Sequence, residues 1–297
     1  MFRDGALWSH PERRVVRVGV RGGFAPVASS RDYVRIWAAA QWRREDFDSL
    51  TIRPFPRSRT AAAALGFELG HVKFRVLEHF NSYGRREDAD LSQILRLGIW
   101  VAPGGWDYAG PHAGVGPELH GQVSAAWRRG FASAQVDGNA IFGSSGLDSG
   151  RVHGRVTLVT QTLPRQTIVL HAEAAVAARP APGGEFDPWL DQRGPRLFGA
   201  HVFTGTHFVW VALENRILVR DNVWDLVGVG VAPFFDWGGA WYADEAARLG
   251  GDVGLAVRLG PTRAVRGEPA EFALGRRFGD GITGSRWGFT LRKGFRF

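Results

Sequence analysis

The sequence predicts an all-β protein, an antiparallel transmembrane β-barrel with a lipid-facing outer surface and a polar lumen. Three observations predict it: the composition, an alternation of apolar and polar residues with a period of two, and turns spaced along the whole chain. The 297 residues include 40 glycines, 12 tryptophans and 20 phenylalanines, yet only 44% are hydrophobic. Such a mixture suits strands with aromatic anchors better than a helical protein.

The hydropathy pattern excludes a transmembrane helix. The longest apolar run, from Leu226 to Phe235, is too short to span a bilayer as a helix and is followed at once by Asp236. A barrel strand needs only about 9–11 residues with apolar side chains at alternate positions, so its hydropathy averages to near zero. The mean hydropathy of −0.15 agrees with such alternation.

Alternating segments recur from end to end and predict about fourteen strands, an even number as in other bacterial barrels. They lie near 13–22, 33–43, 60–69, 71–80, 94–103, 118–129, 131–142, 152–162, 165–177, 206–218, 226–237, 251–260, 268–278 and 284–297. Because nothing between them resembles a linker between two cores, we expect a single barrel domain over residues 1–297.

The last segment alternates most clearly. Trp287, Phe289, Leu291, Phe295 and Phe297 are apolar, whereas most residues between them are small or polar. We expect this strand to close the barrel against the first strand, because a sheet edge in hydrocarbon cannot leave backbone N–H and C=O groups unpaired.

Short turns alternate with longer polar loops along the chain, as expected for periplasmic turns and outer loops. The longest loop runs from Arg179 to Gly205. A loop of this length is unusual in a compact domain, so it is a candidate for function.

Four motifs follow one another in the last third of the chain: Pro195 to Gly199 with Phe203 to Gly205, Val211 to Arg216, Pro233 to Trp241, and Gly251 to Gly260. The first resembles an Arg-Gly-aromatic motif on a loop that folds back into a barrel lumen. In this order, from Arg193 to Phe297, they resemble the C-terminal barrel of the BamA/TamA-type family, the bacterial surface antigen superfamily.

The resemblance implies a sixteen-stranded barrel in the outer membrane of a Gram-negative bacterium, with its first two strands outside this sequence. It implies a role in outer-membrane protein assembly and insertion, or in polypeptide translocation. The implied partners are outer-membrane lipid, unfolded outer-membrane or secreted polypeptides, and periplasmic POTRA domains or partner subunits. No POTRA domain is expected within residues 1–297.

The resemblance also assigns candidate site residues. Arg196, Leu197, Phe198 and Gly199 match the lumenal loop motif, although Leu197 stands where the family has glycine. This substitution puts a tight backbone approach at that position in question.

Two carboxylates are expected to meet this loop. The alternation directs Glu214 and Asp236 into the lumen, opposite the lipid-facing residues of their strands. Arg196 can bridge them, because a guanidinium offers five donors in a fixed fork.

The N-terminus carries no sign of secretion. Met1 to Pro11 has no apolar stretch of the kind found in a signal peptide. Because a secreted barrel needs one, we expect the sequence to begin inside a longer gene product or at a misplaced start codon.

Other function classes find little support. No cysteine is present and none of the nine histidines forms a short paired spacing, so we expect no metal site, no cofactor and no enzyme activity. The net charge of +8 is nearly all arginine and is dispersed along alternating strands, which argues against nucleic-acid binding. Eight tryptophans are expected to form interfacial girdles at strand ends: Trp100, Trp106, Trp127, Trp210, Trp224, Trp237, Trp241 and Trp287.

Several alternatives stay open. The arginine-rich inner face could select anions or acidic peptides, or simply fill a wide lumen with hydrated side chains. The chain could be a passive outer-membrane pore or the barrel anchor of an upstream enzyme domain, because the fold does not determine the activity. A soluble β-protein is a third reading.

Overall fold

The computed structural model describes residues 2–3, 6–7, 13–47, 58–78, 80, 86–103, 113–180, 183–190, 193–262 and 269–293. Over these ranges the protein is all-β, as predicted. Thirteen strands form one antiparallel sheet, and four short strands form two separate pairs. None of the described segments forms a helix long and apolar enough to cross a membrane.

The main sheet is a meander in which each strand pairs with its neighbours in the chain, except that β5 pairs with β8. Its strands are β3 (Arg13–Ala28), β4 (Asp32–Phe47), β5 (Ser58–His71), β8 (Gln93–Ala102), β9 (Gly114–Trp127), β10 (Gly130–Gly143), β11 (Gly146–Thr160), β12 (Gln166–Ala178), β13 (His207–Val223), β14 (Val227–Trp241), β15 (Gly250–Pro261), β16 (Ala270–Gly279) and β17 (Trp287–Lys293). The short pairs are β1 (Phe2–Arg3) with β2 (Ala6–Leu7), and β6 (Phe74–Glu78) with β7 (Arg86–Asp90).

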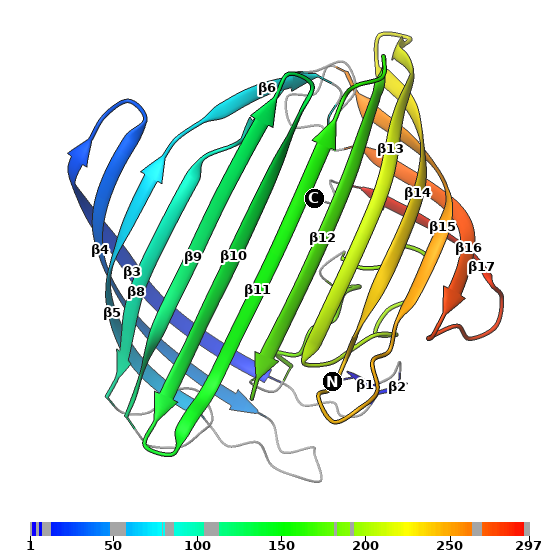
Figure 1. The fold of residues 1–297 in the computed structure, drawn as a ribbon. Helices are drawn as coiled ribbons and strands as arrows, with labels where there is room; N and C mark the ends of the chain where they lie inside the picture. Colours follow the sequence, from blue (N-terminus) through cyan, green and yellow to red (C-terminus); the bar gives the residue numbers. More distant parts are fainter. Residues whose placement is uncertain are drawn as a thin grey trace.

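The sheet is strongly curved, which gives it a convex and a concave face (Figure 1). Alternation assigns each side chain to one of them. On β13, Trp210, Ala212 and Glu214 are buried on the concave side, whereas Leu213 between them is exposed. The segment between β12 and β13, described over residues 179–180, 183–190 and 193–206, lies inside the curve (Figure 1).

The structure corrects the predicted strand count, because the expected strand at 71–80 does not join the main sheet. The chain leaves the sheet after His71 and returns at Gln93, and the intervening β6 and β7 pair only with each other. A backbone hydrogen bond joins the two ends of this segment: the Leu91 amide donates to the Lys73 carbonyl at 2.7 Å. Period-two alternation predicts a strand, but it does not say which neighbour the strand pairs with.

The β6–β7 hairpin packs over the end of the sheet that carries the β9–β10 turn. Leu77 and Leu91 pack there against Phe131, Val159 and Val169 of β10, β11 and β12. The Arg75 guanidinium donates to three carbonyls of the turn, those of residues 127, 128 and 130, at 2.5–2.7 Å. The hairpin thus covers concave-face side chains that the sheet alone would leave open.

The expected closing strand is the C-terminal edge of the sheet. Trp287, Phe289 and Leu291 of β17 are 63–75% exposed, while Phe295 and Phe297 lie outside the described residues. The predicted pairing of the last strand with the first is not seen between the described strands β3 and β17. Because the sheet has thirteen antiparallel strands, its two edge strands run in the same direction and could pair with each other only as parallel strands.

Candidate functional site at the inward-folded loop

The site is built around the inward-folded loop, residues 179–206. Its base is closed by backbone hydrogen bonds, since Phe186 and Gly205 exchange both N–H···O bonds at 2.8 and 3.1 Å. Thr206 then donates to the Trp241 carbonyl at 2.9 Å, which aligns the chain for entry into β13. The loop is therefore fastened to strands on both sides before its central part reaches the concave face.

Arg196 of this loop is fully buried among carboxylates. Its Nε donates to Asp236 Oδ2 at 2.7 Å, one terminal nitrogen to Glu214 Oε2 at 3.1 Å, and the other to Glu271 Oε1 at 3.1 Å. The guanidinium carbon lies 3.8 Å from the centre of the Phe234 ring. All three guanidinium nitrogens thus contact a carboxylate on a different strand.

Two further arginines complete an ionic cluster, which we define as Arg196, Arg216, Arg258, Glu214, Asp236 and Glu271. Arg216 and Arg258 each donate to Glu214 Oε1 at 2.7 Å. Arg258 also lies 3.7 Å from Glu271. With three cations and three anions, the ionic cluster is balanced, and no side chain in it is more than 8% exposed.

Burial makes this pairing necessary, because an isolated charge in a low-dielectric interior is strongly unfavourable. Burial alone lowers the pKa of Arg196, but Asp236, Glu214 and Glu271 outweigh that effect and raise its pKa above the ordinary value. Arg196 is therefore a permanent cation that holds the loop at the carboxylates.

A backbone amide of the loop binds a second buried acidic residue, Asp252. Asp236 and Asp252 are direct cross-strand partners on β14 and β15, and both are fully buried. Like charges placed opposite each other repel. The Leu197 amide donates to Asp252 at 2.8 Å, while Asp236 binds the Arg196 guanidinium. The loop therefore supplies a hydrogen-bond donor to each aspartate, a guanidinium to Asp236 and a backbone amide to Asp252.

Leu197 fits where the resemblance led us to expect glycine. Its side chain packs with three alanines and a phenylalanine of the concave face: Ala232, Phe234, Ala256 and Ala273. Gly288 of β17 faces it, and a methyl group there would lie 3.1 Å from the Leu197 Cβ. Small residues on the strands thus make room for the leucine. Gly199, in contrast, is exposed with open space around it.

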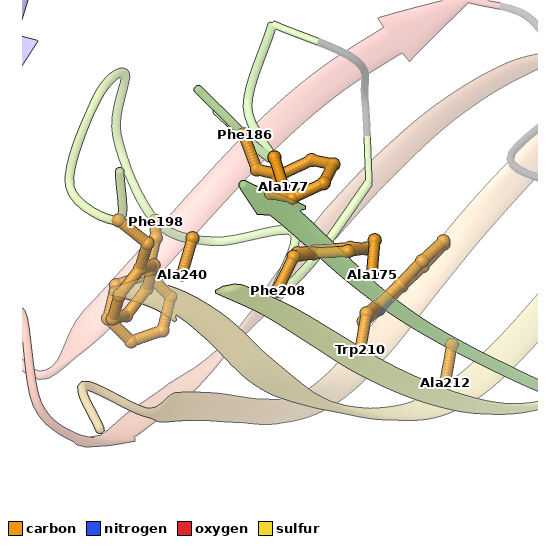
Figure 2. Packing of buried hydrophobic residues seen from close by; sticks show 9 residues of the cluster. Ala175, Ala177, Phe186, Phe198, Phe208, Trp210, Ala212 and Ala240 are labelled. Atoms are coloured by element: carbon orange, nitrogen blue, oxygen red, sulfur yellow. The ribbon is translucent and has the colours of Figure 1, made fainter. Parts of the chain in front are cut away.

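Aromatic residues form an apolar cluster beside the ionic one. Phe198 and Phe203 of the loop pack at 5.2 Å between ring centroids. Figure 2 shows Phe186 and Phe198 from the loop near alanines of the strands, with Phe208 and Trp210 on β13. Trp210 corrects the predicted tryptophan girdle, because it is buried inside this cluster.

The structure brings together three of the expected site residues, Arg196, Glu214 and Asp236, and places Leu197 and Phe198 beside them. The expected closing-strand residues Trp287, Phe289 and Leu291 are exposed instead. Sequence reasoning missed Glu271, Arg216, Arg258 and Asp252, although Arg258 alternates with the apolar residues Val257 and Leu259 of its strand.

No model of a known protein family matches this sequence, and no curated protein is significantly similar to it. The described residues contain no group of three histidine, aspartate or glutamate side chains that could hold a metal ion. The chemistry of the ionic cluster is the binding of a segment of the same chain.

Proposed function

We propose that this protein is an outer-membrane β-barrel of the BamA/TamA type in a Gram-negative bacterium. In this proposal it has no enzymatic activity and either inserts polypeptides into the outer membrane or translocates them across it. The carrying observation is a band of exposed apolar side chains that continues across the sheet. Members of this apolar band include Val18, Ile36, Leu65, Ile99, Val123, Val156, Leu170, Leu213, Phe235, Leu255, Leu274 and Phe289.

A membrane accounts for this band better than water does. Soluble monomers rarely expose contiguous apolar patches larger than a few hundred square ångströms, whereas a barrel presents an apolar belt to lipid. The opposite face carries buried ion pairs and arginines, and this difference in polarity between the two faces supports the proposal of a transmembrane barrel.

Closure of such a barrel requires further strands. Since β3 and β17 run in the same direction, an all-antiparallel barrel needs an odd number of additional strands between them. Three would give the sixteen strands that the family resemblance implies. We propose that another segment or a partner supplies them.

The inward-folded loop supports the family assignment. Arg196 holds the loop on the concave face through carboxylates of β13, β14 and β16, the last strands before the C-terminal edge. Such a loop would brace the wall beside the seam at which an assembly protein opens to its client.

Heat-modifiable electrophoresis tests the barrel. The chain folded in detergent should migrate differently before and after boiling in SDS. Leu255→Arg, on the apolar band, should lose about 2–4 kcal/mol in lipid if it lies near the midplane. Asn139→Arg, on a polar-facing position of β10, is the matched control and should change stability far less. Equal effects of the two, or a soluble monomer in plain buffer, would refute the membrane assignment.

A second assay tests the activity. Vesicles that contain the folded chain should accelerate the insertion of a urea-denatured eight-stranded barrel protein relative to empty vesicles. Arg196→Ala should reduce this acceleration, whereas Arg165→Ala at an exposed turn should preserve it. A heat-modifiable protein that gives no acceleration would leave the barrel standing and contradict the role in insertion.

A further inference from the structure

Three arginines lie on the convex face of the N-terminal strands, at one end of the apolar band: Arg14 of β3, Arg44 of β4 and Arg59 of β5. Alternation places them on this face, because Arg14 is four residues from Val18 and Arg44 is two residues from Trp42. Arg14 and Arg59 are exposed, and the Arg44 side chain is 42% exposed. The convex face thus presents cations beside apolar side chains.

The strand register brings two of these cations together. Arg44 and Arg59 are direct cross-strand partners, and like charges placed opposite each other are unfavourable. Arg44 donates through Nε to Asp46 Oδ2 at 2.7 Å, whereas Arg59 has no carboxylate partner within the part of the chain that the structure describes. An anion that contacts both guanidinium groups would relieve the repulsion between them.

A cavity lies next to these arginines on the same face. Its volume is about 470 Å³, and it is lined mainly by valine, alanine and tryptophan: Val18, Val20, Ala40, Trp42, Ala61 and Ala63. Trp42, which is 41% exposed, stands between Arg44 and Ala40 along β4. A cationic end, a tryptophan and an apolar recess therefore follow one another along the strands.

We propose that this convex site binds an anionic membrane lipid, with the lipid phosphate between Arg44 and Arg59 and an acyl chain in the cavity. Guanidinium groups bind phosphate through paired, charge-assisted hydrogen bonds, and basic clusters at a membrane surface attract anionic headgroups. Tryptophan suits the boundary between headgroup and chain. A free aqueous anion would contact the arginines but leave the apolar cavity unused, so the combination favours a lipid. The inference rests on the proposed membrane location and adds a specific ligand to it.

Quenching of fluorescence by brominated lipids tests the site. The full chain is folded into phosphatidylcholine vesicles that contain either phosphatidylglycerol or phosphatidylcholine with brominated chains. The difference between the wild type and Trp42→Phe isolates Trp42 among the 12 tryptophans. Trp42 should be quenched at a several-fold lower mole fraction of the brominated phosphatidylglycerol, because only that lipid has a net negative headgroup.

Substitution of the arginines tests the headgroup contact. Arg44→Gln and Arg59→Gln, each measured with and without Trp42→Phe, should lower the preference for phosphatidylglycerol roughly fivefold. Arg165→Gln, which removes one charge at the exposed turn near Asp221, is the matched control and should leave the preference unchanged. Arg44→Lys and Arg59→Lys should retain part of it, and heat-modifiable migration checks that each variant is folded.

Substitution in the cavity tests the acyl chain. Ala63→Leu fills the recess with an apolar side chain, so it should weaken the quenching of Trp42 although both arginines remain. Ala174→Leu, at an exposed convex position of β12, is its control. Equal quenching of Trp42 by the two lipids, or no difference between Ala63→Leu and Ala174→Leu, would overturn the site and leave the membrane location standing. Absence of quenching of any tryptophan by either lipid would overturn both.

Discussion

The two ends of the sheet share one sequence pattern and differ in burial. In the C-terminal strands the inward-folded loop covers the concave face, so Trp210 and Glu214 are fully buried. In β3, side chains are exposed on both faces, with Val18 on one and Arg17 on the other. Alternation therefore makes a strand with two faces, but a covering segment makes one of those faces a core.

The arginines differ in the same way. Those of the ionic cluster are buried with three carboxylates, whereas Arg21 and Arg35 of the N-terminal strands pair with Glu118 and Glu68 while remaining 41% and 47% exposed. Removing one partner of a buried ion pair costs more than removing one partner of a solvent-exposed pair. Substitutions in the two regions should therefore have effects of very different size.

The largest effect is expected from Arg196→Ala, which leaves three buried carboxylates with two arginines. It should lower the free energy of unfolding by about 3–5 kcal/mol, as is usual when one partner of a buried ion pair is removed. Urea unfolding followed by tryptophan fluorescence measures it. Arg165→Ala at the exposed turn should cost no more than about 0.5 kcal/mol. Similar losses of unfolding free energy for the two variants would contradict the view that the buried arginine matters more than the exposed one.

Phe203→Ala tests the apolar half of the site. Removing a buried ring should cost about 3–5 kcal/mol through lost packing and the cavity it leaves. Phe24 of β3 is 70% exposed, so Phe24→Ala should cost much less. Thermal unfolding of both variants in one detergent makes the comparison direct, and it would fail if Phe24→Ala proved the more harmful.

Gly250→Ala tests how tightly the loop aromatics meet the sheet. A methyl group there would lie 2.8 Å from both the Phe198 and Phe203 rings and 2.7 Å from the Asp280 carbonyl oxygen, so we expect a loss of about 1–3 kcal/mol. Gly199→Ala places its methyl group in open space and is the control. Unfolding midpoints that shift equally would show that neither the loop aromatics nor the Asp280 backbone packs tightly against β15 at this position.

The smallest effect is expected from Arg75→Ala, on the β6–β7 hairpin. It removes the donor to three turn carbonyls that have partial access to water, so stability should fall by about 1–2 kcal/mol. Hydrogen exchange should increase in β6 and β7 and stay unchanged in β13. A loss of protection throughout the sheet would show instead that the hairpin belongs to the same cooperative unit as the loop.

Much of this arrangement follows from local pattern. Period-two alternation identifies β13 and β17 and directs Glu214 and Asp236 to one face. It does not reveal that Glu271 joins them, because that contact depends on sheet curvature and on the path of the loop. The hairpin at 74–90 was missed for a similar reason: pairing between neighbouring strands is decided by tertiary contacts such as Leu77 on Phe131.

The closed base of the inward-folded loop determines what would happen if the peptide chain were cut within the loop. Phe186 and Gly205 hold each other through two backbone hydrogen bonds, and Arg196 is anchored between them. A single peptide-bond cut between Phe186 and Arg196 would leave both new ends attached to the wall, one through that bridge and one through the guanidinium. The loop is thus a place where the chain can be interrupted while its two parts stay together.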